Sequence, residues 1–265
     1  MNANKGKLII GGAGPGDAEL ITVKLQRRIS EADVIITDRL VNPEIISLYG
    51  RKDATIILAG KQGYNNASVA QQEINQLIVE HALQGKIVLR LKGGDVSIFS
   101  NLLDEIQTAS EAGIEFEIIP GITAAAGAAA YAGIPLTARG LSQGVQFLAF
   151  NPNTYYSGAK WKSLADSNDT LVFYMAGKGI AQLAEILLKY SDRSSTPFAV
   201  IEQATTIHQQ VHVTNLENCA VDFAGKEFSS PTLVVVGEVV SLHKQFKWFN
   251  SQPAAGSIFN ELVIK

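Results

Sequence analysis

Four segments of the chain carry the residue types best suited to ligand chemistry, and each follows an apolar stretch. They are residues 11–17, 38–39, 92–95 and 120–123. Glycine lets a backbone approach a ligand closely because it has no Cβ. Asp38 and Asp95 add carboxylates, which can take up a proton or accept hydrogen bonds. One glycine turn alone is usually a tight connection, but the four segments together indicate a ligand-binding crevice.

Short apolar runs and helical patterns alternate along the whole chain. The first half predicts strands at residues 8–10, 34–37, 55–58, 86–91 and 115–119, and the second half predicts strands at 145–150, 170–174, 198–202, 211–214 and 232–236. This alternation is typical of α/β proteins with mainly parallel or mixed sheets. In open sheets of this kind, ligands bind at the carboxyl ends of the strands, where the four segments lie.

A break in the pattern at residues 133–140, with Pro135 and two glycines, predicts a domain boundary. We therefore expect an N-terminal α/β domain over residues 1–137 and a C-terminal α/β domain over 138–250. Residues 251–265 contain proline and a Gly-Ser pair and are expected to form a surface tail.

Composition excludes several classes of protein. A formal net charge of −3 gives no basic field for nucleic acid, and no stretch approaches the roughly 20 apolar residues of a membrane helix. A single cysteine, Cys219, excludes an internal disulfide framework and fits the cytoplasm. His208 and His212 are expected on or near a strand and not on one helical face, so we expect no metal site.

The first glycine turn also permits a nicotinamide-binding interpretation. Gly12, Gly14 and Gly16 resemble the dinucleotide fingerprint, Asp38 follows at the spacing of a ribose-binding acid, and Asp17 could cap a helix running to about Ser30. Pro15 weakens this hypothesis, since it removes one of the N–H donors that a pyrophosphate cradle needs.

Several segments resemble the uroporphyrinogen III C-methyltransferase family over roughly residues 8–242. The matching stretches are residues 12–17 (GAGPGD), 38–41 (DRLV), 90–95 (RLKGGD), 120–125 (PGITAA), 127–137 (GAAAYAGIPLT), 170–175 (TLVFYM) and 236–240 (VGEVV). Each motif is short, but their order and spacing together are specific.

The resemblance implies a tetrapyrrole methylase fold of two α/β domains, with the active site in an inter-domain cleft, and a homodimer. It implies transfer of two methyl groups from S-adenosyl-L-methionine to uroporphyrinogen III, which gives precorrin-2 for sirohaem or cobalamin synthesis. The coproduct would be S-adenosyl-L-homocysteine.

Residue by residue, the resemblance assigns roles to positions of this chain. Asp38 would be the base and Lys61 the proton donor, while Arg39, Arg139 and also Lys92 are candidates to meet substrate carboxylates. The implied cofactor contacts are Pro15, Gly93, Gly94, Asp95, Ile98, Thr123, Ala124, Met175 and Ala204.

The chain departs from the family pattern after residue 95. Val96 and Ser97 replace a Pro-Phe pair, and Asn101 replaces an arginine. Elsewhere in the chain, Ala138 replaces a histidine, and Gln62 stands where an arginine often follows the Gly-Lys pair. The changes at Asn101, Ala138 and Gln62 all lower the local positive charge. The alternatives left open are another precorrin C-methyltransferase, a NAD-binding oxidoreductase and, least supported, a non-catalytic binding module.

Overall fold

The computed structural model describes residues 5–59, 67–153, 156–252 and 256–259, and the chain forms two compact units. Unit 1 contains the described residues up to Thr123 together with those from Ile258 onward, and unit 2 contains those of Ala124–Ser257. The α/β class predicted from the alternation is confirmed in both units.

Unit 1 is built on a five-stranded parallel sheet with strand order β3-β2-β4-β1-β5. The strands are β1 (Lys7–Gly12), β2 (Val34–Asp38), β3 (Thr55–Ala59), β4 (Ile87–Lys92) and β5 (Glu115–Ile119). Because all five strands run the same way, the segments that follow β1, β2, β4 and β5 meet at one edge of the sheet. The four segments predicted to bind a ligand lie at this edge.

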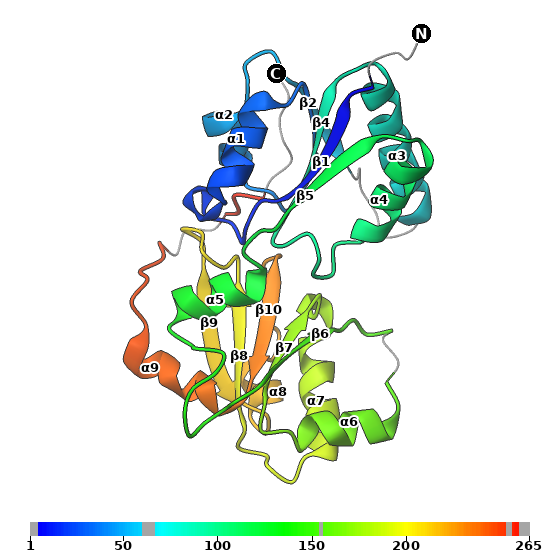
Figure 1. Cartoon of the computed structure of the whole chain (residues 1–265). Helices are drawn as coiled ribbons and strands as arrows, with labels where there is room; N and C mark the ends of the chain where they lie inside the picture. Colours follow the sequence, from blue (N-terminus) through cyan, green and yellow to red (C-terminus); the bar gives the residue numbers. More distant parts are fainter. Residues whose placement is uncertain (1–4, 60–66, 154–155, 253–255, 260–265) are drawn as a thin grey trace. The chain divides into compact units, whose positions relative to one another are not determined.

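Helices cover both faces of this sheet, as Figure 1 shows. Helices α3 (Ala67–Leu83) and α4 (Leu102–Glu111) pack on one face against Leu8, Val34 and Val88. Helices α1 (Val23–Glu31) and α2 (Pro43–Tyr49) pack on the other against Ile9, Ile35 and Leu89. Alternate residues of a strand point to opposite faces, so a strand buried on both faces is apolar throughout.

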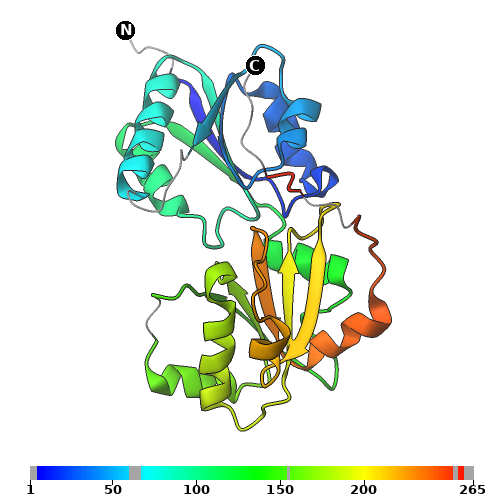
Figure 2. The same ribbon diagram turned by 180° about the vertical axis from the view of Figure 1, so that it is seen from behind.

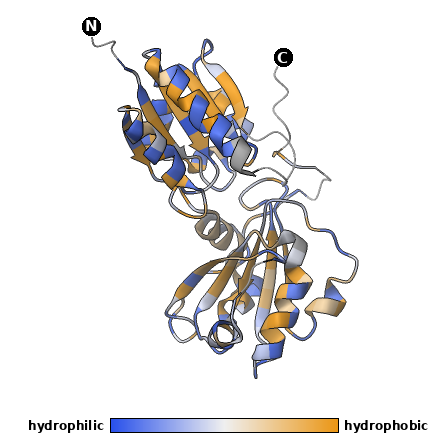
Figure 3. Ribbon diagram, turned by 90° about the vertical axis from the view of Figure 1, so that its right-hand side faces the viewer, coloured by the Kyte–Doolittle hydropathy of each residue, from blue (hydrophilic) through white to orange (hydrophobic). Residues whose placement is uncertain are grey.

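Unit 2 contains a mixed five-stranded sheet with order β6-β7-β10-β8-β9. Its strands are β6 (Val145–Ala149), β7 (Thr170–Tyr174), β8 (Pro197–Glu202), β9 (Gln210–Asn215) and β10 (Thr232–Val236). The β6–β7 pair is parallel and the pairs around β10 and β8 are antiparallel. In Figure 3 the strands of both sheets are mostly hydrophobic, whereas the helices are coloured in both shades.

The second sheet is also covered on both faces (Figure 2). Helices α6 (Gly158–Ala165), α7 (Ile180–Tyr190) and α8 (Cys219–Asp222) pack on one face, around Phe173 and Phe198. The other face carries the alanine-rich α5 (Ala124–Ala132) and the short 3₁₀ helix Glu238–Leu242; α9 (His243–Phe246) follows that helix.

The boundary between the units lies between Thr123 and Ala124, and not after Thr137 as the sequence predicted. Ala125, Ala128 and Ala132 are buried against Val172 and Val235 of the second sheet, so α5 belongs to unit 2. The small side chains let this helix lie close to the strands. The turn containing Pro135 lies within unit 2 and is not a linker.

The residues after 250 are also tied to the protein more closely than a surface tail would be. In unit 2, the Gln252 N–H donates to the Ile207 carbonyl and the Gln203 side-chain amide donates to the Gly256 carbonyl. Phe259, which belongs to unit 1, is buried. Across the described residues, no helix is both long enough and apolar enough to cross a membrane.

Acid should destabilise unit 1 through Glu117 on β5. Its carboxylate contacts Lys24, Arg28 and Lys7, and the hydrogen bond from Lys24 is the main cause that lowers its pKa from 4.5 to about 2. The stabilisation is therefore full above pH 4.5 and is lost as the pH falls through 2. We expect Glu117→Gln to cost about 1 kcal/mol at pH 7, because its partners are partly exposed, and almost nothing near pH 2. Urea unfolding at both pH values measures this; an equal cost at both would contradict it.

Candidate functional site

Three glycine-containing turns pack against one another at the carboxyl edge of the first sheet. Gly14 and Gly94 form a reciprocal pair of backbone hydrogen bonds, with Gly14 N to Gly94 O at 3.1 Å and Gly94 N to Gly14 O at 2.7 Å. The Ala13 N–H donates to the Lys92 carbonyl at 2.7 Å. The turn after β1 is thereby fixed to the turn after β4.

Close backbone approach explains why these positions are glycine. A Cβ on Gly12 would lie 2.6 Å from the Gly94 carbonyl oxygen and 2.7 Å from the Gly121 nitrogen. A Cβ on Gly121 would lie 2.3 Å from that same oxygen. The sequence pattern predicts that such glycines let a ligand approach the backbone, but the structure shows that these two are required by contact between the neighbouring backbone segments.

Asp95 joins the turn after β4 to the turn after β5. Its Oδ2 accepts from the Gly121 N–H at 2.8 Å, and its Oδ1 accepts from the backbone and hydroxyl of Ser97. Burial raises the pKa of Asp95, but these hydrogen bonds outweigh burial and leave the pKa below its ordinary value of 3.8. Asp95 is therefore a carboxylate at neutral pH, which suits a cationic or hydroxylic ligand.

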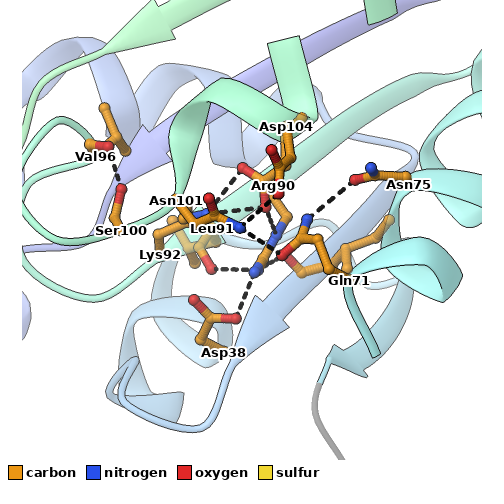
Figure 4. A network of polar contacts seen from close by, with 12 residues as sticks. Asp38, Gln71, Asn75, Arg90, Leu91, Lys92, Val96, Ser100, Asn101 and Asp104 are labelled. Carbon is orange, nitrogen blue, oxygen red and sulfur yellow. Dashed lines mark hydrogen bonds and ion pairs between the residues drawn. The ribbon is translucent and has the colours of Figure 1, made fainter. Parts of the chain in front are cut away.

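Asp38, at the end of β2, belongs to a network of four charged side chains, of which the other three are buried. Arg90 Nη2 donates to Asp38 Oδ1 at 2.5 Å, and Arg90 Nε donates to Glu105 Oε1 at 2.8 Å. Lys92 Nζ contacts both oxygens of Glu105 at 2.8 Å. Figure 4 shows the Arg90 guanidinium directed at Asp38. The two carboxylates and two cations balance.

The pKa values of the two cations respond differently to this environment. Burial lowers the pKa of Arg90, but the charges of Asp38 and Glu105 outweigh it and the net direction is upward. Burial also lowers the pKa of Lys92, and there it prevails over the attraction of Glu105. Lys92 is 3 % exposed and held by Glu105, so the interpretation of Lys92 as a contact for substrate carboxylates is wrong.

Sequence reasoning missed Glu105, although a signal was present. Arg90 and Lys92 are two residues apart in an otherwise apolar strand, so their side chains share a face with Val88. That face is covered by α3 and α4, as the packing of Val88 shows. Two cations on a buried face require an anion from a covering helix, and α4 carries acidic residues in its first turn.

The other residues predicted for catalysis or substrate binding are spread over the chain. Arg39 follows Asp38 and is exposed, so its guanidinium is accessible to an anion. Arg139 is exposed in unit 2. Lys61 lies outside the described residues. The roles of Asp38, Arg39, Lys61 and Arg139 stay predictions.

The positions implied as cofactor contacts occur in both units. Pro15, Gly93, Gly94, Asp95, Ile98 and Thr123 belong to unit 1, and Ala124, Met175 and Ala204 belong to unit 2. In unit 1, the turns that carry Pro15, Gly94 and Asp95 are joined by the hydrogen bonds described above. In unit 2, Ala124 begins α5, Met175 is 57 % exposed after β7, and Ala204 is buried after β8.

Backbone strain coincides with several of these positions. Among the described residues, the non-glycine residues with positive φ are Phe99, Asn101, Met175, Gln203 and Thr205. Phe99 follows Ile98, and Gln203 and Thr205 flank Ala204. Such conformations cost about 1–3 kcal/mol each and are enriched at ligand sites. They support a functional role for the loops after β4, β7 and β8.

The geometry of the first turn argues against a nicotinamide dinucleotide. Ala13 and Gly14 donate their N–H groups to Lys92 and Gly94, and Pro15 has none, so these three residues offer a pyrophosphate no backbone donor. The expected helix does not begin at Asp17, which caps only a 3₁₀ turn; α1 begins at Val23 with Thr22 as its cap. Asp38, the predicted ribose contact, is bound to Arg90. Within the described part of the chain, no group of three or more His, Cys, Asp or Glu side chains is arranged to hold a metal.

Known proteins match most of the chain. Residues 7–220 match the model of the Tetrapyrrole (Corrin/Porphyrin) Methylases. A siroheme synthase of Saccharophagus degradans is 42 % identical over 92 % of this chain and 53 % of its own length. The chain thus spans about half the length of that curated relative.

Two solved structures from Thermus thermophilus are similar over nearly their full length. A uroporphyrin-III-C-methyltransferase is 30 % identical, with a TM-score of 0.75 over 92 % of this chain and 98 % of that one. A uroporphyrin-III C-methyltransferase complexed with S-adenyl homocysteine is 30 % identical, with a TM-score of 0.73 over 89 % and 93 %. The family model and these matches show that the chain belongs to the tetrapyrrole methylase family.

Proposed function

We propose that this chain is an S-adenosyl-L-methionine-dependent C-methyltransferase that methylates uroporphyrinogen III twice and gives precorrin-2. The observation that carries the proposal is the carboxyl edge of the first sheet, where a partly exposed carboxylate, Asp38, is held by Arg90 beside interlocked glycine turns. Similarity to the uroporphyrin-III C-methyltransferase of Thermus thermophilus supports the substrate.

The residues at this edge fit the proposed cofactor. When bound, S-adenosyl-L-methionine supplies an electrophilic methyl group on a cationic sulfur. The Asp95 carboxylate and the backbone carbonyls of the turns match a cation, while the occupied or missing N–H groups at Ala13, Gly14 and Pro15 do not match a diphosphate. The Thermus thermophilus structure in complex with S-adenyl homocysteine supports the same choice.

Asp38 is proposed to take up the proton that the substrate must lose. A ring carbon forms a bond to the methyl group, the carbon–sulfur bond breaks with its electron pair going to sulfur, and the methylated ring is left cationic. Loss of one proton to the Asp38 carboxylate restores a neutral ring. A hydrogen bond from Arg90 to Asp38 Oδ1 fixes the orientation of the carboxylate. General-base assistance of this kind accelerates a reaction by about 10²–10⁴-fold.

Exposed cations are proposed to bind the acidic periphery of the substrate. Arg39 and Arg139 can bind carboxylates in a bidentate manner, and Lys61 is the proposed proton donor. The homodimer implied by the resemblance stays a prediction, which analytical ultracentrifugation tests. The cytoplasmic location inferred from the single cysteine also stays a prediction.

The deciding experiment is anaerobic incubation of the protein with S-adenosyl-L-methionine and uroporphyrinogen III. We expect a product heavier by C₂H₄, with an intermediate heavier by CH₂. If the protein methylates precorrin-2 and not uroporphyrinogen III, it is another precorrin C-methyltransferase. The departures from the family pattern at Asn101 and Ala138 would then reflect a different substrate. Absence of both products would refute the proposal.

Ligand stabilisation provides an independent check. A ligand that binds only the folded state raises the melting temperature. We expect S-adenosyl-L-homocysteine to raise the melting temperature and NAD to leave it unchanged. The reverse result would restore the oxidoreductase interpretation.

A further inference from the structure

Glu105 is the most completely enclosed charged side chain of the network under Asp38. Its side chain is 0 % exposed, and its two oxygens accept hydrogen bonds from Arg90 and Lys92. Burying charges in this way is costly, and replacing a buried ion pair by apolar residues is often neutral or stabilising. The network therefore calls for an explanation other than stability.

The fold delivers Glu105 to this place through the start of α4. Asn101 precedes the helix in the left-handed conformation, with φ 53°, and its side-chain amide donates to Asp104 at 2.9 Å and to Gln71 of α3 at 3.4 Å. Glu105 follows one helical turn later, and residues four apart lie on the same side of a helix. It meets Arg90 and Lys92 on the face of β4 that α3 and α4 cover.

Three side chains of the network are buried, and the fourth, Asp38, is partly exposed. The side chains of Arg90, Lys92 and Glu105 are at most 4 % exposed, whereas that of Asp38 is 32 % exposed. Asp38 is thus the member that a ligand can reach. Glu105 acts on it through Arg90, whose guanidinium contacts both carboxylates.

We infer that Glu105 is a positioning residue for methyl transfer: it fixes the Arg90 guanidinium against Asp38 and, by neutralising Lys92, sets the electrostatic field at Asp38. The inference rests on the proposed function of Asp38. Among the described residues, Arg90 of β4 contacts Asp38 and Lys92 of the same strand interacts with it electrostatically. Arg39 follows Asp38 in the chain, and the register partner of Asp38 on β3 is the uncharged Ala59. Lys61 lies outside the described residues.

Removing the negative charge of Glu105 and removing the positive charge of Lys92 should shift the pH dependence of kcat/KM in opposite directions. Asp38 works as a base only when ionised. Glu105→Gln removes an anion next to Arg90 and leaves the guanidinium of Arg90 charged, which favours the Asp38 carboxylate, so the acid limb of the kcat/KM profile should move to lower pH. Lys92→Met removes a cation and should move that limb to higher pH. Each displacement should be on the order of 0.5 pH unit, and the double variant should lie near the wild type.

A merely structural role for Glu105 gives a different result. Loss of packing would lower kcat or stability in each variant without moving the acid limb in opposite directions, and that outcome overturns the inference. If Glu105→Gln does not fold, Lys92→Met can still be compared with the double variant. The double variant keeps one anion, Asp38, and one cation, Arg90, so its acid limb should return toward that of the wild type.

A second readout does not depend on turnover. The carboxyl carbon of Asp38 can be followed by ¹³C NMR during a pH titration, with its signal assigned from Asp38→Asn. The midpoint should fall in Glu105→Gln and rise in Lys92→Met. If the wild type does not methylate uroporphyrinogen III, the proposed function fails, but the midpoints still decide whether Glu105 controls Asp38; unchanged midpoints would refute that control.

Discussion

Replacing Asp38 by asparagine is expected to lower kcat for methylation of uroporphyrinogen III by about 10²–10⁴-fold while leaving S-adenosyl-L-homocysteine binding unchanged. Asparagine keeps the size of the side chain and an oxygen that can accept the Arg90 hydrogen bond. It cannot take up the proton that the methylated ring must lose. Single-turnover kinetics and calorimetric titration measure the two quantities separately.

An aspartate away from the site provides the matched control for this variant. Asp53 pairs with Arg51 on the surface, and its side chain is 70 % exposed. Asp53→Asn should therefore leave both kcat and ligand binding at wild-type values, since surface ion pairs contribute little. Full turnover by Asp38→Asn would remove Asp38 from the mechanism. Equal loss of turnover and binding would assign it to the cofactor site.

The second large effect is expected from Gly121→Ala. The new Cβ would lie 2.3 Å from the Gly94 carbonyl oxygen and 2.6 Å from the Gly12 carbonyl oxygen. Both neighbours are backbone atoms of turns held by hydrogen bonds, so they cannot move aside as a flexible side chain would. Overpacking of this kind costs about 3 kcal/mol or more, measured as the free energy of unfolding in urea.

Gly177→Ala is the control for this substitution. A Cβ at Gly177 would meet only the side chain of Thr232, at 3.7 Å, which is an ordinary contact. Its φ is not in the left-handed region. We expect a change within about 0.5 kcal/mol for this variant. If Gly121→Ala proves as stable as Gly177→Ala, the turns do not depend on their mutual backbone contact.

Strand positions were the most predictable part of the fold because the strands of a sheet buried on both faces are almost wholly apolar. The predicted strand 34–37 corresponds to Val34–Asp38, and the strand 170–174 was predicted as found. The domain boundary was not predictable in the same way. A turn with Pro135 looks like a linker in the sequence, whereas the packing of α5 against Val172 and Val235 depends on distant strands.

The site was predictable where chemistry follows strand ends, and unpredictable where it depends on a neighbouring helix. Asp38 and Asp95 were predicted as site residues from their positions at or after strand ends, and their roles stay predictions. Glu105 was not, because its pairing with Arg90 and Lys92 joins a helix to a strand across the core. The same limitation applied to Lys92, whose charge suggested an exposed substrate contact although it is buried.

The interlocking of the turns after β1, β4 and β5 has a consequence for the thermodynamics of ligand binding. Hydrogen bonds within the chain join Gly14 to Gly94 and Gly121 to Asp95. A ligand at this edge therefore has little backbone to immobilise, and the entropy penalty that flexible recognition loops incur on binding should be small in unit 1. The affinity for a ligand at this edge should therefore depend mainly on its contacts with the protein and little on the cost of ordering the turns.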